Sequence, residues 1–281
     1  MHDQNPFKKE YDFLKLAEYS PDLKKGVIQN KYGKSTINFA EPKAVTTLNT
    51  ALLKFQYGID WDIPDKNLCP PIPGRLDYLL HVSELVQKES IHLLDVGAGA
   101  SLIYPILGTC HFNWKCTASE ISESSLKNAK QIIAKNSKLE SIELRKQDYK
   151  SFILNKIIKP SDFFDVLICN PPFYKSSIDA KRQNTRKNKN LKNKHKQSRN
   201  FSGVPDELWC SGGEKKFIQT LVKEGAKFKN QITWFTTLVS NKEHLGPIQK
   251  SIQNTKPKTV KVIQMEQGNK TSRILAWSYL K

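Results

Sequence analysis

The sequence lacks the cysteine pattern of a disulfide-stapled domain or of a common zinc site. Its five cysteines, at positions 69, 110, 116, 169 and 210, are odd in number and form no C-x-x-C pair. Apolar runs long enough to span a membrane are also missing, and the opening "MHDQNPFKKEYDF" is charged where a secretion signal is apolar. These absences predict a soluble intracellular protein in a reducing compartment, with neither a metal site nor a membrane segment.

Acidic residues are scarce relative to basic ones. The chain holds 45 Lys and Arg against 27 Asp and Glu, a net charge of +18, and its pI is near 9.6. Such a balance indicates a polyanionic partner, most often nucleic acid. It does not tell whether the protein only binds that partner or also modifies it.

The sequence pattern changes near residue 88. Before that point strands and helices do not alternate, and apolar residues at helical spacing predict helices over 41–58 and 70–86. The chain of 281 residues is long enough for a large core with an appendage. We therefore expect a small helical region over 1–88 and a second domain over 89–281.

The second domain alternates strand-like and helix-like segments, which is typical of an α/β fold with a mostly parallel sheet. Two final strand-like segments follow each other with only a turn between them, which predicts an antiparallel C-terminal hairpin. The expected strands are 91–99, 114–120, 142–148, 163–169, 231–239, 259–267 and 272–280, and the expected helices are 122–136, 212–228 and a broken one over 242–254.

One segment differs sharply in composition from the rest. Residues 181–199, inside an expected insertion over 176–205, hold nine Lys or Arg and no acidic residue. With a single aliphatic residue, Leu191, the segment cannot form a core by itself. It is a solvated insertion, a nuclear-import signal, or an arm that contacts phosphates, and its charge favours the last two.

An apolar strand-like run ends abruptly at Asn170-Pro171-Pro172-Phe173. Consecutive prolines remove two backbone donors and fix two φ angles, so neither a helix nor a central strand continues through them. The carboxyl ends of strands in an open α/β sheet are where ligands bind. The motif therefore indicates a rigid tip, polar and then aromatic, at a binding site, with an ordinary surface turn as the alternative.

A second candidate site motif is "DVGAGAS", residues 95–101, which follows a strand and opens a helix. The glycines Gly97 and Gly99 let the backbone approach a ligand closely. A dinucleotide fingerprint needs a third glycine where Leu102 stands, which argues against NAD and FAD. The acidic residue after the second strand, Glu120, suits the two hydroxyls of an adenosine ribose.

With these motifs together, the sequence resembles the methyltransferase-like protein 16 family. The resemblance rests on "DVGAGASLIYPILG", "CNPPFY", "SGGEKKFI" and "ILAWSYL", and it extends from about residue 5 to the end. It implies a Rossmann-like class I methyltransferase fold and S-adenosylmethionine as cofactor. It also implies methyl transfer to adenine N6 in U6 small nuclear RNA, with bacterial relatives that act on large ribosomal RNA.

The resemblance also implies roles for particular residues. The Asn170 amide oxygen and the Pro171 carbonyl would accept the two N6 hydrogens, and Phe173 would stack on the base. Arg75 would pair with the methionine carboxylate, whereas Asp95 would orient the glycine turn or meet the methionine amine. The implied catalytic residues are Asn170, Pro171, Pro172 and Phe173, and the implied cofactor-binding residues are Arg75, Asp95, Gly97, Gly99, Ser101, Glu120, Asp148 and Asn170.

For RNA binding the resemblance implies the region 1–88 and a basic arm, in which we name Arg182, Arg186 and Arg199. A U6 substrate implies a nuclear protein, with the cytoplasm as the alternative, and we expect a monomer. Three other functions remain open: a protein glutamine-N5 methyltransferase, a ribosomal RNA adenine-N6 methyltransferase, and a non-catalytic RNA-binding relative. Phe173, where the glutamine enzymes typically have Tyr, and the net charge of +18 favour RNA.

Overall fold

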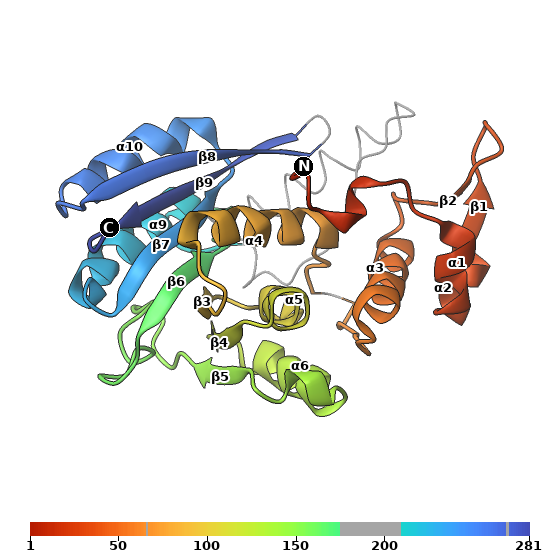
Figure 1. Cartoon of the computed structure of the whole chain (residues 1–281), viewed down its shortest axis with the longest axis horizontal. Coiled ribbons are helices and arrows are strands. Elements are labelled where there is room, and N and C mark those ends of the chain that lie inside the picture. Colours follow the sequence, from red (N-terminus) through yellow and green to blue (C-terminus); the bar gives the residue numbers. More distant parts are fainter. Residues whose placement is uncertain (66, 175–208, 268–269) are drawn as a thin grey trace.

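The computed structural model describes residues 1–65, 67–174, 209–267 and 270–281, and Figure 1 shows their arrangement. The helices are α1 (Phe13–Glu18), α2 (Pro21–Gly26), α3 (Pro42–Tyr57), α4 (Ile72–Val86), α5 (Ile103–Phe112), α6 (Glu123–Ala134), α9 (Gly213–Gly225) and α10 (Lys242–Gln253). The strands are β1 (Val27–Gln29), β2 (Ser35–Ile37), β3 (His92–Val96), β4 (Lys115–Glu120), β5 (Glu143–Lys146), β6 (Phe164–Cys169), β7 (Ile232–Val239), β8 (Thr259–Gln267) and β9 (Lys270–Ser278).

The main sheet has the strand order β5-β4-β3-β6-β7-β9-β8. Strands β5, β4, β3, β6 and β7 run parallel, whereas β9 pairs antiparallel with both β7 and β8. The predicted mostly parallel sheet with an antiparallel C-terminal hairpin is confirmed. Because the chain goes from β3 to β4 on one side and places β6 on the other, β3 and β6 flank a topological switch point. A crevice opens at the carboxyl ends of such a strand pair.

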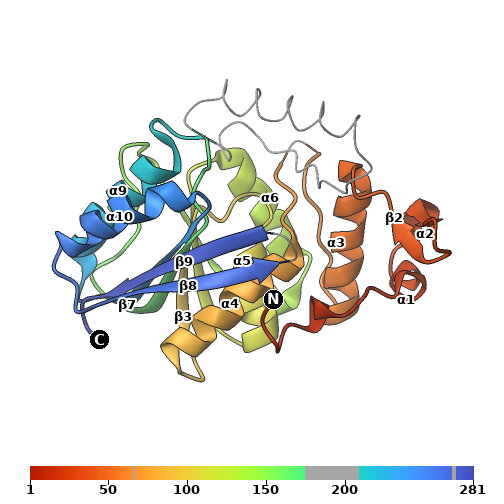
Figure 2. The same cartoon turned by 90° about the horizontal axis from the view of Figure 1, so that it is seen from above.

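Helices cover both faces of this sheet (Figures 1 and 2). On β3, Leu93 packs with the core under α4 and α5, whereas Leu94 packs with the core under α9 and α10. Neighbouring residues thus enter opposite cores, as the twofold period of a strand requires. This double burial explains why the parallel strands read as continuous apolar runs in the sequence.

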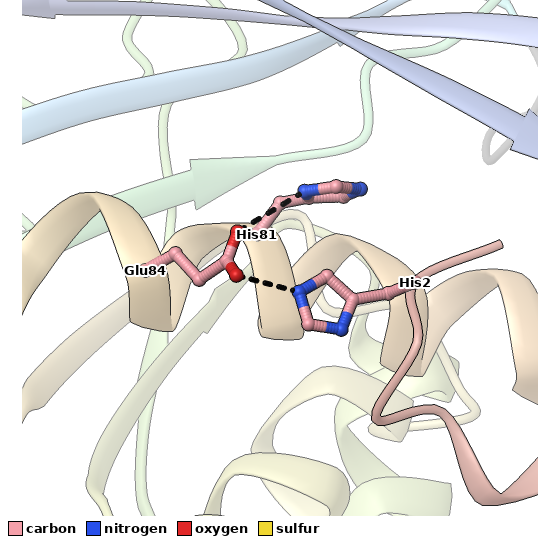
Figure 3. Close-up of side chains that lie close together, drawn as sticks. All are labelled: His2, His81 and Glu84. Carbon is pink, nitrogen blue, oxygen red and sulfur yellow. Dashed lines mark ion pairs between the residues drawn. The ribbon is translucent and has the colours of Figure 1, made fainter.

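The N-terminal region combines helices with a short antiparallel hairpin, β1–β2, which the sequence did not predict. Its apolar side chains, among them Phe13, Leu23 and Leu52, belong to the same buried cluster as Leu93 of the sheet. The first residues lie along α4, where His2 Nε2 is 3.0 Å from a Glu84 oxygen (Figure 3). The Asn5 amide also donates to the Pro73 carbonyl at 2.9 Å. The N-terminal region is therefore packed on the helical layer beside the crevice.

Helix α10 continues through Pro247, where the sequence predicted a break. Proline inside a helix removes one backbone hydrogen bond and normally kinks or ends it. Here Ile248 and Ile252, which follow the proline by one and five positions, are fully buried against the sheet core. Burial of this apolar face holds the helix together across the proline. Within the described residues, no helix is both long and apolar enough to cross a bilayer.

Candidate active site

A cavity of about 660 Å³ lies at the carboxyl ends of β3, β4 and β6, the position that the switch point predicts. This volume is in the range of small-ligand sites. Its walls come from the glycine turn, the Asn-Pro-Pro tip, the start of α4, the loop after β5, and α9. The lining residues used below are Arg75, Gly97, Gly99, Ser101, Tyr104, Glu120, Gln147, Lys150, Phe152, Asn170, Pro172, Trp209 and Lys216.

The glycine turn needs the backbone freedom of its glycines, because Gly97 and Gly99 have φ values of 77° and 64°. The amides of Gly97 and Ala98 donate to the Ser119 carbonyl at 2.9 and 3.1 Å, which fixes the turn to β4. A Cβ built on Gly97 would meet nothing within 4 Å. The turn therefore presents bare backbone to open space, as the sequence motif predicted.

Glu120 ends β4 and is held by backbone amides. Its Oε2 accepts from the Gly99 amide at 2.8 Å, and its Oε1 accepts from Ile121 and Ser122, each at 2.8 Å. These bonds link the glycine turn to the start of α6 and place the carboxylate on the cavity wall. The position is the one expected for a group that accepts from a ribose.

Asp95 lies directly behind the glycine turn and is 1% exposed. In the part of the chain that the structure describes, neither of its carboxylate oxygens has a hydrogen-bond partner. Burial raises the pKa of Asp95 to about 8, the charge of Glu120 adds to this rise, and Arg75 opposes it. Asp95 does not hydrogen-bond to the glycine turn, so the predicted orienting role is not seen, and the residue is not part of the cavity lining.

Arg75 reaches the cavity from the first turn of α4. Its Nη1 donates to the Tyr104 hydroxyl of α5 at 2.9 Å, and its Cζ lies 5.5 Å from the centre of that ring. The aromatic ring fixes the guanidinium at the cavity wall. The site thus offers a fixed cation to an anionic group of a ligand.

Asn170 follows β6 and lines the cavity together with Pro172. Its amide oxygen is buried and has no hydrogen-bond partner among the described residues. Pro171 and the half-buried Phe173 are not in the cavity lining. The structure therefore brings Asn170 and Pro172 to the site, whereas the predicted stacking of Phe173 on a base stays a prediction.

The loop after β5 contributes other residues than the one predicted. Asp148 is absent from the cavity lining, and its carboxylate lies 3.5 Å from the Lys146 amine with 64% of the side chain exposed. The neighbouring Gln147 is buried at the cavity and donates to the Asn155 carbonyl at 3.0 Å. The structure does not bring Asp148 to the site: beyond the end of β5, Gln147 is buried at the cavity whereas Asp148 points to solvent.

Several residues of the cavity were missed by the sequence analysis. Trp209, Phe152 and Lys216 line the cavity from three different segments. Trp209 stands just before the paired glycines Gly212 and Gly213, and an aromatic next to such a turn is the only signal that could have found it. The predicted RNA-binding residues Arg182, Arg186 and Arg199, and the insertion 176–205, lie outside the described residues.

The chain matches one family model over residues 1–281, and that family is described as RNA methyltransferase. It is 43% identical to the ribosomal RNA large subunit methyltransferase F of Flavobacterium johnsoniae, over 100% of this chain and 93% of the relative. It is 44% identical to the protein of the same name from Christiangramia forsetii, over 99% of this chain and 100% of the relative.

Two solved human structures are similar in fold. The catalytic domain of METTL16 in complex with the MAT2A 3′UTR hairpin 1 has a TM-score of 0.88 and 30% identity, over 99% of this chain and 95% of that one. The N-terminal domain of METTL16 in complex with SAH has a TM-score of 0.81 and 26% identity, over 100% and 99%.

The relatives named ribosomal RNA large subunit methyltransferase F are bacterial proteins. Because bacteria have no nucleus, the predicted nuclear localisation is wrong.

Proposed function

The chain belongs to a family of RNA methyltransferases, and we propose that it methylates the N6 amine of an adenine in large-subunit ribosomal RNA. S-adenosylmethionine is the methyl donor, in accord with the SAH complex of the similar human structure. The observation that carries the proposal is the amide oxygen of Asn170, a residue that lines the cavity at the switch point of the sheet: this oxygen is buried and has no partner among the described residues.

The cavity residues fit this cofactor. Glu120 would accept from the ribose hydroxyls, and the open backbone at Gly97 leaves room for close approach. Arg75 would pair with the methionine carboxylate, and the buried Asp95 carboxyl group suits a cationic partner such as the methionine amine. Ser101, which is also on the wall, would contact the same ligand.

When bound, S-adenosylmethionine supplies an electrophilic methyl group. The adenine amine is a weak nucleophile because its lone pair is delocalised into the ring. The Asn170 oxygen and the Pro171 carbonyl would accept the two N6 hydrogens, favour a pyramidal nitrogen and hold it in line for attack. The methyl group would pass to N6 as its bond to the sulfonium sulfur breaks, which leaves SAH, and N6 would lose one proton to water. The two prolines make the tip rigid, and Phe173 would stack on the extruded base.

Large-subunit ribosomal RNA is preferred over U6 RNA on the strength of the relatives. Proteins named ribosomal RNA large subunit methyltransferase F are 41 to 44% identical to this chain over nearly its whole length. The human structures, which share the fold at 26 to 30% identity, are the more distant group among these. U6 RNA, which the sequence analysis favoured, therefore becomes the rival substrate.

RNA contacts are proposed for the N-terminal region 1–88 and for the basic arm with Arg182, Arg186 and Arg199. The β1–β2 hairpin supports the first part, because Tyr32 at its tip is 75% exposed and Lys31 Nζ lies 4.8 Å from the ring centre. An exposed aromatic beside a cation is suited to stacking on an unpaired base. Binding through many cations should weaken steeply with salt.

The test is methyl transfer from labelled S-adenosylmethionine to three acceptors, followed by digestion to nucleosides or amino acids. The acceptors are unmodified large-subunit ribosomal RNA fragments, a U6-like hairpin, and a glutamine-containing peptide. We expect N6-methyladenosine in a ribosomal RNA fragment, with no label in the peptide.

Label only in the U6-like hairpin would replace the proposed substrate with its rival while keeping the chemistry. Label in glutamine would overturn the RNA substrate. RNA binding without transfer to any acceptor, together with failure to bind SAH, would leave only a non-catalytic RNA-binding relative.

A further inference from the structure

Trp209 is attached to the proposed catalytic tip by backbone pairing. It forms a parallel β-bridge with Tyr174, and the Cys210 amide donates to the Tyr174 carbonyl at 3.1 Å. Tyr174 is four residues after Asn170 in a stretch made rigid by two prolines. The bridge therefore fixes Trp209 relative to Asn170, and both side chains line the same cavity.

The indole N–H of Trp209 is buried and, among the residues described, has no hydrogen-bond partner. An unpaired buried donor destabilises a fold by about 1–3 kcal/mol, so it is uncommon without another use. The missing partner does not by itself identify a site, because the buried Trp234 of β7 also has an unpaired N–H. Trp234, however, lies outside the cavity lining, whereas Trp209 is in it.

Two residues of the cavity lining thus carry a buried polar atom without a partner among the described residues: Asn170 has an acceptor, its amide oxygen, and Trp209 has a donor, its indole N–H. The amine edge of adenine has the complementary pattern, because N6 donates while the ring nitrogens on either side of it, N1 and N7, accept. Guanine and uracil present a carbonyl where adenine presents its amine, so Asn170 would face another acceptor. The pair therefore matches adenine and opposes these two bases.

We propose that Trp209 is a specificity-determining residue whose indole N–H donates to a ring nitrogen beside the reacting amine, N1 or N7. The inference rests on the proposed function and extends it from the amine to the base edge. With Asn170 and Trp209 both engaged, the base has two fixed points in its plane, which orients N6 for attack.

The experiment measures single-turnover methyl transfer to three RNAs whose target nucleoside is adenosine, 1-deazaadenosine or 7-deazaadenosine. The enzymes are the wild type and Trp209→Phe, which keeps an aromatic ring and removes the N–H. We expect Trp209→Phe to slow transfer to adenosine about tenfold, as for one lost buried hydrogen bond. One of the two deaza-RNAs lacks the ring nitrogen that Trp209 contacts. On that RNA the wild-type rate should fall by the same factor of about ten, and Trp209→Phe should not lower the rate any further.

Trp234→Phe is the matched control, since it removes an equally unpaired N–H away from the cavity, and it should not change the rate. Replacing Trp209 with benzothienylalanine, which keeps the bicyclic shape without an N–H, serves if the Phe variant is poorly folded. SAH affinity should be the same in all folded variants.

Several outcomes overturn the inference. Trp209→Phe could slow all three RNAs by the same factor, leave the rate unchanged, or weaken SAH binding as much as it slows transfer. The last result would place the N–H on the cofactor instead of the base. If the wild type forms no N6-methyladenosine in any RNA, the proposed function itself fails, and this failure is visible before any variant is compared.

Discussion

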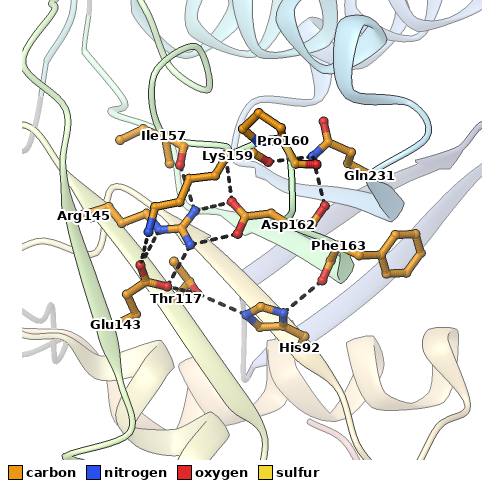
Figure 4. Close-up of polar contacts among 10 residues, drawn as sticks. All are labelled: His92, Thr117, Glu143, Arg145, Ile157, Lys159, Pro160, Asp162, Phe163 and Gln231. Atoms are coloured by element: carbon orange, nitrogen blue, oxygen red, sulfur yellow. Dashed lines mark hydrogen bonds and ion pairs between the residues drawn. The ribbon is translucent and has the colours of Figure 1, made fainter.

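Arg145 on β5 donates to the carboxylates of both Glu143 and Asp162, whereas the Asp95 carboxyl group at the end of β3 has no hydrogen-bond partner among the described residues. Both Arg145 and Asp95 are buried in the central sheet. We call Arg145, Glu143, Lys159 and Asp162 the Arg145 network (Figure 4), and Asp95, Glu120 and Asn170 the strand-end site. In the strand-end site, Glu120 and Asn170 line the cavity described above.

The Arg145 network satisfies its own charges. Arg145 donates to Asp162 with both terminal nitrogens, one of them at 3.0 Å, and to the Ile157 carbonyl at 2.8 Å. The hydrogen bond from Arg145 lowers the pKa of Glu143 to about 2. Buried charge that is paired in this way fastens the loop before β6 to the sheet. Buried polar groups left unpaired among the described residues, as the carboxyl group of Asp95 and the amide oxygen of Asn170 are, reduce stability.

Asn170→Ala, in the strand-end site, should have the largest effect on activity and little effect on stability. Removing the amide should lower the single-turnover methyl transfer rate by about 10²- to 10³-fold, as for loss of one preorganised group at a reacting centre. The free energy of unfolding should hardly change, because the oxygen has no partner within the described residues. Asn254→Ala, at an exposed position after α10, is the matched control and should leave both quantities unchanged.

Arg145→Met should have the opposite effects. It leaves Glu143 and Asp162 without their cation, so the free energy of unfolding should fall by about 3 kcal/mol, while SAH affinity of the folded protein is retained. Urea unfolding and calorimetric titration measure the two quantities. Lys159→Met, which removes a cation that is 58% exposed, should change stability by less than about 1 kcal/mol. Equal losses in the two variants would contradict this view of the network.

The pH dependence of stability should have opposite signs in the two places. The folded-state pKa of Asp95 is raised to about 8, so between its ordinary value of 3.8 and about 8 the folded protein binds more protons than the unfolded chain. Its contribution to stability therefore declines as pH rises through this window, by at most about 1.4 kcal/mol per pH unit. Asp95→Asn should remove this decline in urea titrations between about pH 5 and about pH 8.

Glu143 provides the contrast, because its folded-state pKa is lowered from 4.5 to about 2. Its stabilising contribution is complete above the unfolded pKa and is lost as pH falls through the folded one. Glu143→Gln should therefore differ from the wild type near neutral pH and converge with it in acid. For the Asp95 prediction, equal slopes of unfolding free energy against pH in Asp95→Asn and the wild type would contradict the raised pKa of Asp95.

His92→Gln should have the smallest effect. His92 Nδ1 must carry the proton that it donates to the Phe163 carbonyl at 2.9 Å, so its Nε2 accepts from the Thr117 hydroxyl at 3.1 Å. Loss of these bonds should reduce stability by about 1 kcal/mol. Burial, with Lys115 adding, lowers the pKa of His92. The wild type should therefore lose stability below about pH 6.5, where the unfolded chain takes up a proton first, and the variant should not.

The sequence predicted the sheet well because the central strands β3, β6 and β7 are buried on both faces and read as apolar runs. It also predicted where Gly97, Glu120 and Asn170 meet, since Gly97 and Asn170 directly follow such strands and Glu120 ends β4. It missed the β1–β2 hairpin, whose strands have three residues each and little buried surface. It also predicted a break in α10 at Pro247, where the helix in fact continues. The burial of Ile248 and Ile252, which holds the helix together, depends on tertiary packing that the local sequence does not reveal.

Within the site, the sequence failed where a contact is not local. Asp148 was named as a cofactor residue, although local spacing does not decide which of Gln147 to Tyr149 lies at the cavity. The structure buries Gln147 there. Trp209 gave no usable signal, since its place at the cavity depends on pairing with Tyr174, 35 positions earlier in the chain.

The bridge between Tyr174 and Trp209 also makes the position of Trp209 relative to Asn170 independent of the length of the chain between them. It joins the chain at the points where residues 175–208 leave and return, so the spacing of Asn170 and Trp209 is set by the bridge and not by what lies between. Residues inserted or deleted in that interval leave this spacing unchanged. If the basic arm proposed above contacts RNA, exchanging the interval between relatives should change RNA binding without moving Asn170 relative to Trp209.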